Sequence, residues 1–260
     1  MPKTIVITGA SSGIGEALAL RYACAGTTLG LIGRSASRLK RVADRCRERG
    51  AEVHTAVLDV RMRADMLAWL TGFDDARPVD LLIANAGIME GRAEPGGIEG
   101  AEASLALMET NVLGVLNAIH PLVPQMVAHR RGQIAIVSSI AAFIPLPDAP
   151  SYGASKAAIL SYGLALRDLL EGHGIRVSVI CPGYVRTPMM DQESGTKPGA
   201  MEPAAAAELI VRGLERNRAV ITFPFWFSLM TRLGGLLPDR LRRRSMDPYR
   251  FTVAPRRTGD

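Results

Sequence analysis

A glycine-rich turn between a strand-like run and a helix-like run is the feature that most restricts how this chain can fold. Residues 4–8, Thr-Ile-Val-Ile-Thr, are apolar and β-branched, which predicts a buried strand, and residues 16–20 favour a helix. Glycines in such a turn let the backbone approach a phosphate, and the start of the helix attracts its negative charge. The pattern favours a nucleotide-binding unit over a turn that binds nothing. The turn residues expected at the phosphate are Gly9, Ser11, Ser12, Gly13, Ile14 and Gly15.

The apolar pattern of the whole chain alternates between short and long runs. Strands are predicted near 4–8, 28–33, 53–58, 79–84, 133–138, 175–180 and 219–222. Helices are predicted near 13–25, 35–49, 62–71, 101–128, 151–172 and 203–216. Alternating strands and helices predict an α/β fold with a doubly wound, parallel, seven-stranded sheet and helices on both faces. The chain has 260 residues and no internal repeat or linker, so we expect a single domain over 1–260.

A phenol and an ammonium group are four residues apart in the run Tyr152-Gly153-Ala154-Ser155-Lys156. On a helix these two groups share one face and can approach each other. Free tyrosine has a pKa of about 10, too high for acid–base work near neutrality, and a neighbouring cation lowers that pKa. Such a pair occurs often by chance on surface helices, so its meaning depends on the other motifs.

Further polar residues lie where predicted strands end. Ser139 follows the apolar run 134–137, and Asn85-Ala86-Gly87 follow the run 79–84. Ligands bind at the carboxyl ends of strands in open parallel sheets, so these side chains are expected at one site. Asn111 lies within a predicted helix, where helix propensity gives no reason for an asparagine.

Together these motifs strongly resemble the short-chain dehydrogenase/reductase family, in the family's order and over about residues 3–190. The resemblance implies a Rossmann-like fold and an NAD(P)-dependent oxidoreductase that interconverts a ketone or aldehyde and an alcohol. It implies a catalytic tetrad of Asn111, Ser139, Tyr152 and Lys156. It also implies cofactor contacts from the glycine-rich turn and from Asp59, Val60, Asn85, Ala86, Gly87, Tyr152, Lys156, Pro182, Gly183, Val185 and Thr187.

By this resemblance, each member of the tetrad has a role in carbonyl reduction. Ser139 donates a hydrogen bond to the substrate oxygen, and Tyr152 delivers a proton as hydride arrives from the cofactor. Lys156 lowers the pKa of Tyr152 and binds the nicotinamide ribose, and Asn111 holds a water that links Lys156 to solvent. The alternative is a non-catalytic nucleotide-binding regulatory or membrane-peripheral protein on the same fold, and the complete tetrad argues against it.

The residues after the second predicted strand indicate which cofactor is preferred. An acidic residue at this position selects NAD, whereas an arginine accommodates the 2′-phosphate of NADP. The strand ends in Gly-Arg-Ser without an acid, so Arg34, Ser35 and Arg38 are expected to hold that phosphate. NADP is therefore predicted over NAD.

Residues 186–203 are predicted to form a mobile loop over the substrate, because they lack periodicity and contain three prolines. Met189, Met190 and Met201 offer adaptable apolar contacts, which favours an apolar substrate. Arg186 and Lys197 are cations in the same loop, so a negatively charged substrate stays an alternative.

Residues 223–260 form a C-terminal extension that is first apolar and then basic. In one interpretation residues 223–230 and the leucines after them complete the core, covering the substrate pocket or a subunit contact. In the other, the apolar residues and Arg240, Arg242, Arg243 and Arg244 lie on an anionic membrane surface.

The cysteines, the histidines and the net charge restrict the cellular compartment and the binding partners of the protein. Three cysteines without metal-ligand spacing indicate a reduced, cytoplasmic chain, and the scattered histidines predict no catalytic metal. A net charge of +6 is too small to indicate nucleic-acid binding. Relatives form dimers or tetramers through the helices near 101–128 and 151–172, so we expect a homo-oligomer. Gly163, Ala157 and Ala165 are the small residues that would allow close packing there.

Overall fold

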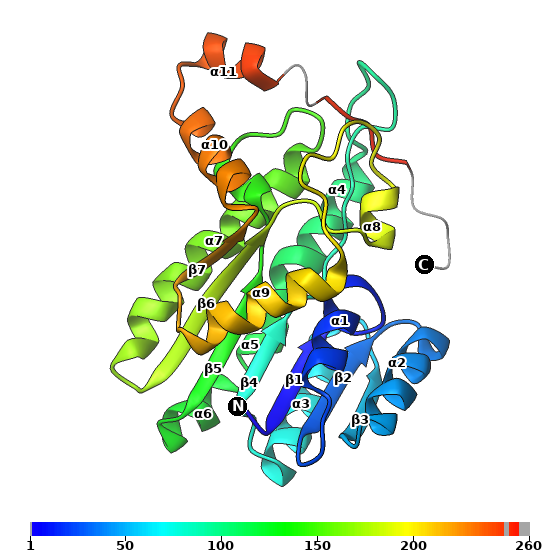
Figure 1. Ribbon diagram of the computed structural model, residues 1–260, viewed down its shortest axis with the longest axis vertical. Helices are drawn as coiled ribbons and strands as arrows, with labels where there is room; N and C mark the ends of the chain where they lie inside the picture. The colour runs from blue at the N-terminus through cyan, green and yellow to red at the C-terminus, as the bar shows by residue number, and fades with distance from the viewer. Residues whose placement is uncertain (1, 247–249, 255–260) are drawn as a thin grey trace.

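Seven parallel strands form one sheet at the centre of the protein (Figure 1). The computed structural model describes residues 2–246 and 250–254. Positions 1, 247–249 and 255–260, which belong to the predicted 1–260 domain and in part to the predicted 223–260 extension, lie outside the described residues. The strands are β1 (Thr4–Thr8), β2 (Thr28–Gly33), β3 (Glu52–Val57), β4 (Leu81–Ala84), β5 (Gly132–Val137), β6 (Ile175–Pro182) and β7 (Val220–Phe223).

The order of the strands in the sheet is β3-β2-β1-β4-β5-β6-β7. All seven predicted strands are present, and each begins and ends within two residues of the prediction. Every residue of β4 and β5 is buried, as expected for central strands that helices cover on both faces. The chain runs outward in opposite directions from the β1–β4 pair, so a crevice opens where their carboxyl ends meet.

Helices cover both faces of the sheet (Figure 1). On one face lie α1 (Gly13–Tyr22), α2 (Ala36–Glu48) and α9 (Pro203–Glu215), and on the other α3 (Arg63–Ala76), α5 (Gly114–Ile119) and α7 (Pro150–Glu171). Each layer buries its own apolar core against the strands. The doubly wound, Rossmann-like fold is therefore confirmed.

The helix predicted near 101–128 is divided into several pieces. These are α4 (Ala101–Met108), the π-helical turn η1 (Glu109–Leu113), α5 and a separate α6 (Val123–His129). The single-helix prediction was wrong, because Pro121 and Pro124 cannot continue an α-helix and the chain turns between α5 and α6. The π-helical turn contains Asn111, and such turns occur often at functional sites.

The 186–203 loop and the residues after β7 lie over the carboxyl edge of the sheet. The predicted loop 186–203 includes one short helix, α8 (Pro188–Asp191), and β7 leads into α10 (Phe225–Gly235) and α11 (Asp239–Met246). The segment 250–254 then crosses the loop, where Val253 pairs with Glu193. A third apolar cluster forms beneath this segment and includes Phe251, Val253 and Tyr152. No helix within the described residues is long and apolar enough to cross a membrane.

One glycine expected at a subunit contact faces the sheet instead. A Cβ atom on Gly163 would lie 2.5 Å from Val179 of β6, so the missing side chain lets α7 pack closely on the strands. Ala157 and Ala165 are exposed on the opposite side of α7. The prediction for Gly163 was therefore wrong, because close packing inside the layer uses this position.

Candidate active site

The glycine-rich turn joins β1 to α1 at the carboxyl edge of the sheet. Gly9 and Gly13 have φ angles of +65° and +60°, a region that glycine enters without strain. A Cβ atom on Gly15 would collide with the carbonyl oxygen of Gly9, so this glycine lets α1 approach the turn. The first N–H groups of α1, which starts at Gly13, then point toward the crevice.

A side chain that sequence reasoning did not single out holds the turn after β4 in place. Thr8 Oγ1 accepts hydrogen bonds from the backbone N–H groups of Asn85 and Ala86, at 3.0 and 3.1 Å. Asn85 Nδ2 donates in return to the carbonyls of Thr8 and Gly9, at 3.0 and 3.2 Å. These four hydrogen bonds hold the turn after β1 against the turn after β4.

A cavity of about 1100 Å³ extends along this edge. Most of the predicted site residues line it: Gly9, Ser11, Ser12, Gly13, Ile14, Arg34, Ser35, Arg38, Asp59, Val60, Asn85, Ala86, Gly87, Ser139, Tyr152, Lys156, Pro182, Gly183, Val185 and Thr187. Gly15 and Asn111 do not line the cavity and lie behind its wall. Residues from every part of the sheet edge thus meet in one space.

The shape and charge of this cavity fit a dinucleotide. A Cβ atom on Gly87 would lie 3.4 Å from Lys156 Nζ, so a side chain there would fill the space beside the lysine. A Cβ atom on Gly13 would lie 3.0 Å from Thr187, and would narrow the cavity above the start of α1. Arg34 and Arg38 make the β2 end of the cavity positive. The cavity therefore offers backbone N–H groups for a pyrophosphate and cations for a further phosphate.

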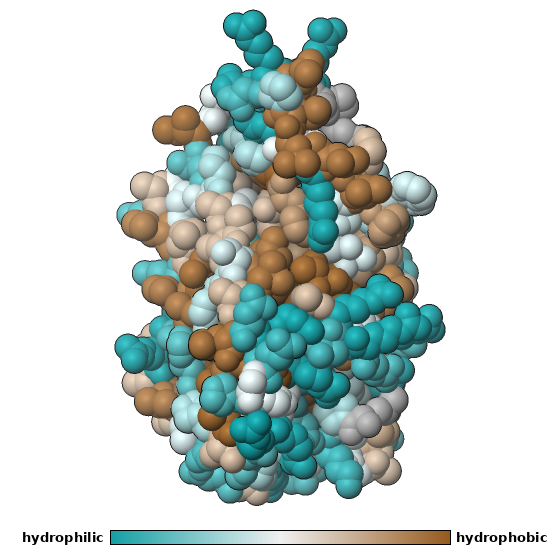
Figure 2. Space-filling view, turned by 90° about the vertical axis from the view of Figure 1, so that its left-hand side faces the viewer, coloured by the Kyte–Doolittle hydropathy of each residue, from teal (hydrophilic) through white to brown (hydrophobic). Residues whose placement is uncertain are grey.

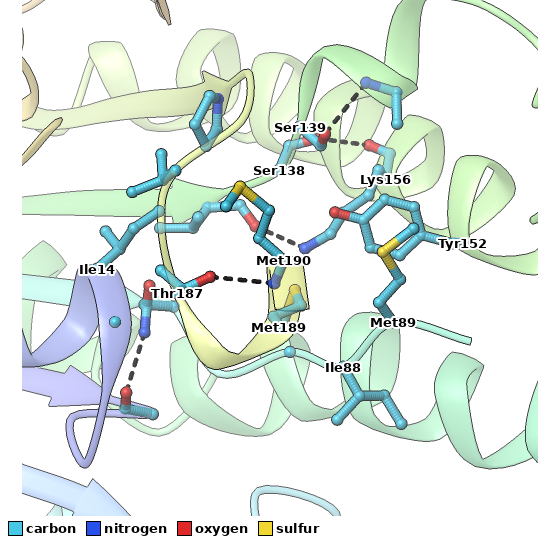
Figure 3. A pocket seen from close by; sticks show the side chains of 18 of the residues that line it. Ile14, Ile88, Met89, Ser138, Ser139, Tyr152, Lys156, Thr187, Met189 and Met190 are labelled. Carbon is cyan, nitrogen blue, oxygen red and sulfur yellow. Dashed lines mark hydrogen bonds between the residues drawn. The ribbon is translucent and has the colours of Figure 1, made fainter. Parts of the chain in front are cut away.

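Ser139, Tyr152 and Lys156 come together at the wall of the cavity (Figure 3). Tyr152 and Lys156 lie one turn apart on α7, as their spacing predicted, and the Lys156 Nζ is 5.7 Å from the centre of the Tyr152 ring. Lys156 Nζ donates to the carbonyl of Val137, the last residue of β5, at 3.1 Å. Ser139 Oγ accepts from the N–H of Ala141, at 3.1 Å, which fixes the serine at the start of a short 3₁₀ turn, η2 (Ile140–Phe143).

Burial controls the protonation of this pair. It raises the pKa of Tyr152 to about 12, although the hydrogen bond with Ser139 acts in the opposite direction. It lowers the pKa of Lys156 to about 8. The sequence predicted that Lys156 would lower the pKa of Tyr152. The structure does not have this lowered pKa, because loss of solvent around the phenol outweighs the hydrogen bond with Ser139 that favours its charged form.

Asn111 holds the strand-end backbone from behind the cavity. Its side chain is fully buried; Oδ1 accepts from the N–H of Ile88 at 2.8 Å, and Nδ2 donates to the carbonyl of Ile88 at 2.9 Å. Nδ2 also donates to Ser155 Oγ at 3.1 Å, and Ser155 Oγ donates to the carbonyl of Tyr152 at 2.8 Å. This chain of bonds joins the β4 turn to the turn of α7 that carries Tyr152.

The outer end of the cavity is mostly apolar. The residues that form it come from the β4 turn, η2, the 186–203 loop, α10 and the C-terminal segment: Met89, Ile140, Ile144, Leu146, Met189, Met190, Phe227, Met230, Leu233, Leu237 and Phe251. Met189 and Met190 lie where the sequence predicted (Figure 3). Met201 packs against the core beneath α1 and α9 instead, because it pairs with Val185 in a β-bridge.

The charged residues at this end are acidic. Asp191 and Glu193 line the cavity, whereas Arg186 pairs with Glu202 and Lys197 donates to the Glu193 carbonyl. The Glu193 carboxylate accepts from the Tyr184 hydroxyl at 3.2 Å, and burial raises its pKa to about 7. The two cations that sequence reasoning kept for a charged substrate therefore bond within the loop itself.

A comparison with known families agrees with this geometry. The family described as short chain dehydrogenase matches residues 3–198, about three quarters of the chain. The chain belongs to the short-chain dehydrogenase/reductase family. As a member of this family, it is an NAD(P)-dependent oxidoreductase that acts on a small molecule.

Individual oxidoreductases resemble it over nearly their whole length. An uncharacterized oxidoreductase from Myxococcus xanthus is 34% identical over 245 residues, covering 92% of this chain and 94% of the relative. A solved short-chain dehydrogenase from Sphingobium yanoikuyae in complex with NADPH has a TM-score of 0.77 at 28% identity, covering 91% and 99% of the two chains. The bulky-bulky ketone specific alcohol dehydrogenase from Comamonas testosteroni has a TM-score of 0.76 at 25% identity, covering 100% and 99%.

Several residues of this short-chain dehydrogenase site carried no sequence signal that we used. Glu193, Leu146 and Phe251 lie in segments without periodicity, so only the folded chain brings them to the cavity. Ser155 and Thr8 could have been found within the motifs that contain them, since small hydroxyl residues beside catalytic positions often orient the backbone. Among the described residues, no three His, Cys, Asp or Glu side chains gather into a metal-binding set.

Proposed function

We propose that this protein is an NADPH-dependent carbonyl reductase for bulky, apolar ketones. One observation carries the proposal: a single cavity joins a cationic end at β2, the Ser139–Tyr152–Lys156 group and an apolar outer end. The relative with bound NADPH and the relative specific for bulky ketones support the two halves of the proposal. In the reverse direction the same site would oxidise a secondary alcohol.

The preference for NADPH over NADH rests on the residues after β2. Arg34, Ser35 and Arg38 lie at the cavity wall, where an acidic residue would repel a 2′-phosphate. Arg34 is exposed just before α2, and Arg38 lies one turn further along the chain, in the first turn of that helix. When bound, NADPH supplies the hydride.

Residues of the protein itself then bind the substrate oxygen and protonate it. Ser139 donates a hydrogen bond to it, and Tyr152 gives it a proton as negative charge develops there. The raised pKa of Tyr152 suits this direction, because the phenol stays protonated at neutral pH and the alkoxide is the stronger base. Lys156 has a pKa of about 8, so it is mostly a cation at neutral pH and can stabilise the phenolate that forms.

Asn111 has a positioning role in this proposal. Its hydrogen bonds to Ile88 and Ser155 fix the distance between the β4 turn and α7, and with it the position of Tyr152. The water that the family resemblance implies at Asn111 stays part of the proposal. Removing the side-chain amide of Asn111 would therefore also shift the position of Tyr152.

The substrate class follows from the outer cavity. Methionine, leucine and phenylalanine side chains there favour burial of an apolar body. Asp191 disfavours a carboxylate or phosphate on the substrate, since like charges would meet, and Glu193 adds to this effect as it ionises near pH 7. A neutral ketone with large apolar groups on both sides fits these two constraints.

The proposal is tested with purified protein and a panel of ketones, followed by the loss of NADPH absorbance. Bulky neutral ketones should turn over with both a lower KM and a higher kcat/KM than acetone-sized ones, and carboxylated analogues of equal bulk should be poor. NADH should support the reaction less well than NADPH. A protein that binds NADPH but turns over neither ketones nor alcohols would instead be the non-catalytic alternative.

We also propose that the protein forms a homodimer or homotetramer through α4, α5 and α7. Leu105 and Leu169 are exposed on α4 and α7, Leu113 is exposed at the end of η1 next to α5, and Ala157 and Ala165 allow close approach. Cytoplasmic localisation and the absence of a catalytic metal stay predictions from the sequence. Analytical ultracentrifugation of the wild type and Leu169→Glu tests the subunit contact.

A further inference from the structure

The helix α10 exposes an unusual number of large apolar side chains. Trp226 is 74% exposed and Met230 67%, and Leu236, just past the end of the helix, is 83% exposed. Phe225, Leu233 and Leu241 are each more than half exposed nearby. Such contiguous apolar surface on a folded protein marks a contact with a partner or a membrane.

The same helix forms the outer wall of the cavity. Met230, Leu233 and Leu237 both line the cavity and reach the outer surface. The opposite side of α10 is anchored, because Phe227 stacks on Tyr184 with ring centres 6.1 Å apart and Arg232 lies over Phe143, 4.3 Å from the ring centre. The exposed apolar stripe therefore begins at the edge of the cavity and faces away from the protein.

A basic helix continues this stripe. α11 carries four arginines and one acidic residue, and Asp239 pairs with Arg242 at 2.5 Å and with Arg243 at 3.6 Å. Arg240, Arg243 and Arg244 are exposed. Figure 2 shows brown apolar and teal hydrophilic side chains side by side at the top of the molecule, where Figure 1 places α10 and α11.

We propose that residues 225–244, the α10–α11 surface, dock on an anionic lipid bilayer and hold the cavity entrance against it. Apolar side chains that enter the headgroup region and cations that meet anionic lipids are the two signals that stable peripheral binding needs. A second copy of the chain on this surface fits less well, because two-fold symmetry would bring the like-charged α11 helices together. The occupant that satisfies both the apolar stripe and the arginines is a negatively charged membrane surface.

This arrangement implies a route for the substrate. A lipophilic ketone dissolved in the bilayer could pass Met230, Leu233 and Leu237 into the cavity without crossing water. This step rests on the proposed function, whereas membrane docking itself does not.

Sedimentation with vesicles tests the docking. The wild type should pellet with vesicles of phosphatidylcholine and phosphatidylglycerol at low salt, and much less with phosphatidylcholine alone or at high salt. Arg240→Gln, Arg243→Gln and Arg244→Gln together should lower the partition coefficient about 100-fold. The matched control removes the same charge elsewhere, as Arg63→Gln, Arg176→Gln and Arg216→Gln, and should bind like the wild type.

The apolar stripe is tested with Trp226→Ser combined with Met230→Ser. This variant should also lose vesicle binding, whereas Leu67→Ser, which removes a half-exposed leucine on α3, should not. Circular dichroism and thermal unfolding establish that each variant folds. Wild-type protein that stays in the supernatant with anionic vesicles at low salt overturns the proposal. So does a Trp226→Ser and Met230→Ser variant that binds vesicles normally but has lost self-association, since the surface would then be a subunit interface.

Activity separates docking from the proposed reaction. The docking variant with Arg240→Gln, Arg243→Gln and Arg244→Gln changes no residue of the cavity lining. It should keep wild-type turnover of a water-soluble ketone and lose most of its turnover of a lipophilic ketone supplied in anionic vesicles. Equal turnover of the vesicle-borne ketone by the wild type and this arginine variant overturns the membrane route. Loss of all ketone turnover in the wild type would refute the proposed function and leave the sedimentation result valid.

Discussion

The Nζ of Lys156 lies 5.7 Å from the centre of the Tyr152 ring, and both side chains are buried beside the carboxyl end of β5. Burial acts on the two groups in opposite directions: the phenol holds its proton more tightly, and the ammonium group holds its proton less tightly. The pair therefore combines a proton donor that stays protonated with a cation that titrates near physiological pH.

Tyr152→Phe should reduce kcat for ketone reduction by about 10²–10⁴-fold, the usual contribution of a general acid. The affinity for NADPH should change little, because the ring remains and only the hydroxyl is lost. Steady-state kinetics and fluorescence titration of NADPH measure the two effects. A variant that retains most of its kcat would exclude Tyr152 as the proton donor.

The pH profile of the wild type should report Lys156. Because its pKa is lowered to about 8, it is a cation below that pH and becomes neutral above it. The kcat/KM for ketone reduction should therefore fall as pH rises through about 8. Lys156→Met, which keeps the buried aliphatic volume, should have a much lower kcat/KM and lack this descending limb. The same limb in both proteins would assign the titration to another group.

Arg34→Ala should weaken NADPH binding far more than NADH binding. A hydrogen bond between charged groups is worth about 1.5–3 kcal/mol, or roughly 10–150-fold in Kd. Arg41→Ala, which removes an exposed arginine of the following helix α2 outside the cavity lining, is the matched control. Equal losses for the two cofactors would show that Arg34 does not contact the 2′-phosphate.

Glu193 should make folding stability depend on pH. Its pKa is raised from 4.5 to about 7, so the folded state binds more protons than the unfolded state between these values. The free energy of unfolding should therefore decrease as pH rises from about 4.5 to about 7, by an amount on the order of 2–3 kcal/mol. Glu193→Gln should flatten this dependence. Urea unfolding at a series of pH values measures it, and identical slopes would place the titration elsewhere.

Asp148 should hold the C-terminal segment over the cavity. It is 2% exposed and accepts hydrogen bonds from Arg250 at 2.8 Å and from the N–H of Phe251 at 3.2 Å; Arg92 pairs with it at 2.8 Å. Asp148→Ala takes the carboxylate away from the two partly exposed arginines and leaves the buried Phe251 N–H without its acceptor, which costs about 2 kcal/mol and should lower Tm by roughly 4–8 °C. The KM for bulky ketones should rise, since Phe251 lines the cavity. Unchanged Tm and KM would show that the segment does not depend on this contact.

Local sequence by itself determined the strands, the glycine turn and the spacing of Tyr152 and Lys156. These features depend on backbone geometry and on the period of side-chain burial, which neighbouring residues set. The break between α5 and α6 was equally local, because Pro121 and Pro124 are visible in the sequence. The prediction of a single helix there gave too little weight to the ability of these prolines to end a helix.

Only the tertiary structure decided which distant residues surround the cavity and how they titrate. Glu193, Phe251 and α10 reach it through packing over the sheet edge, and no local period encodes such contacts. The pKa of Tyr152 follows from loss of solvent in the folded core, which the adjacent Lys156 could not indicate. Gly163 faces the sheet for the same reason: which side of a helix is buried depends on what packs against it. Sequence thus determined the elements and the reactive groups, and three-dimensional packing decided their surroundings.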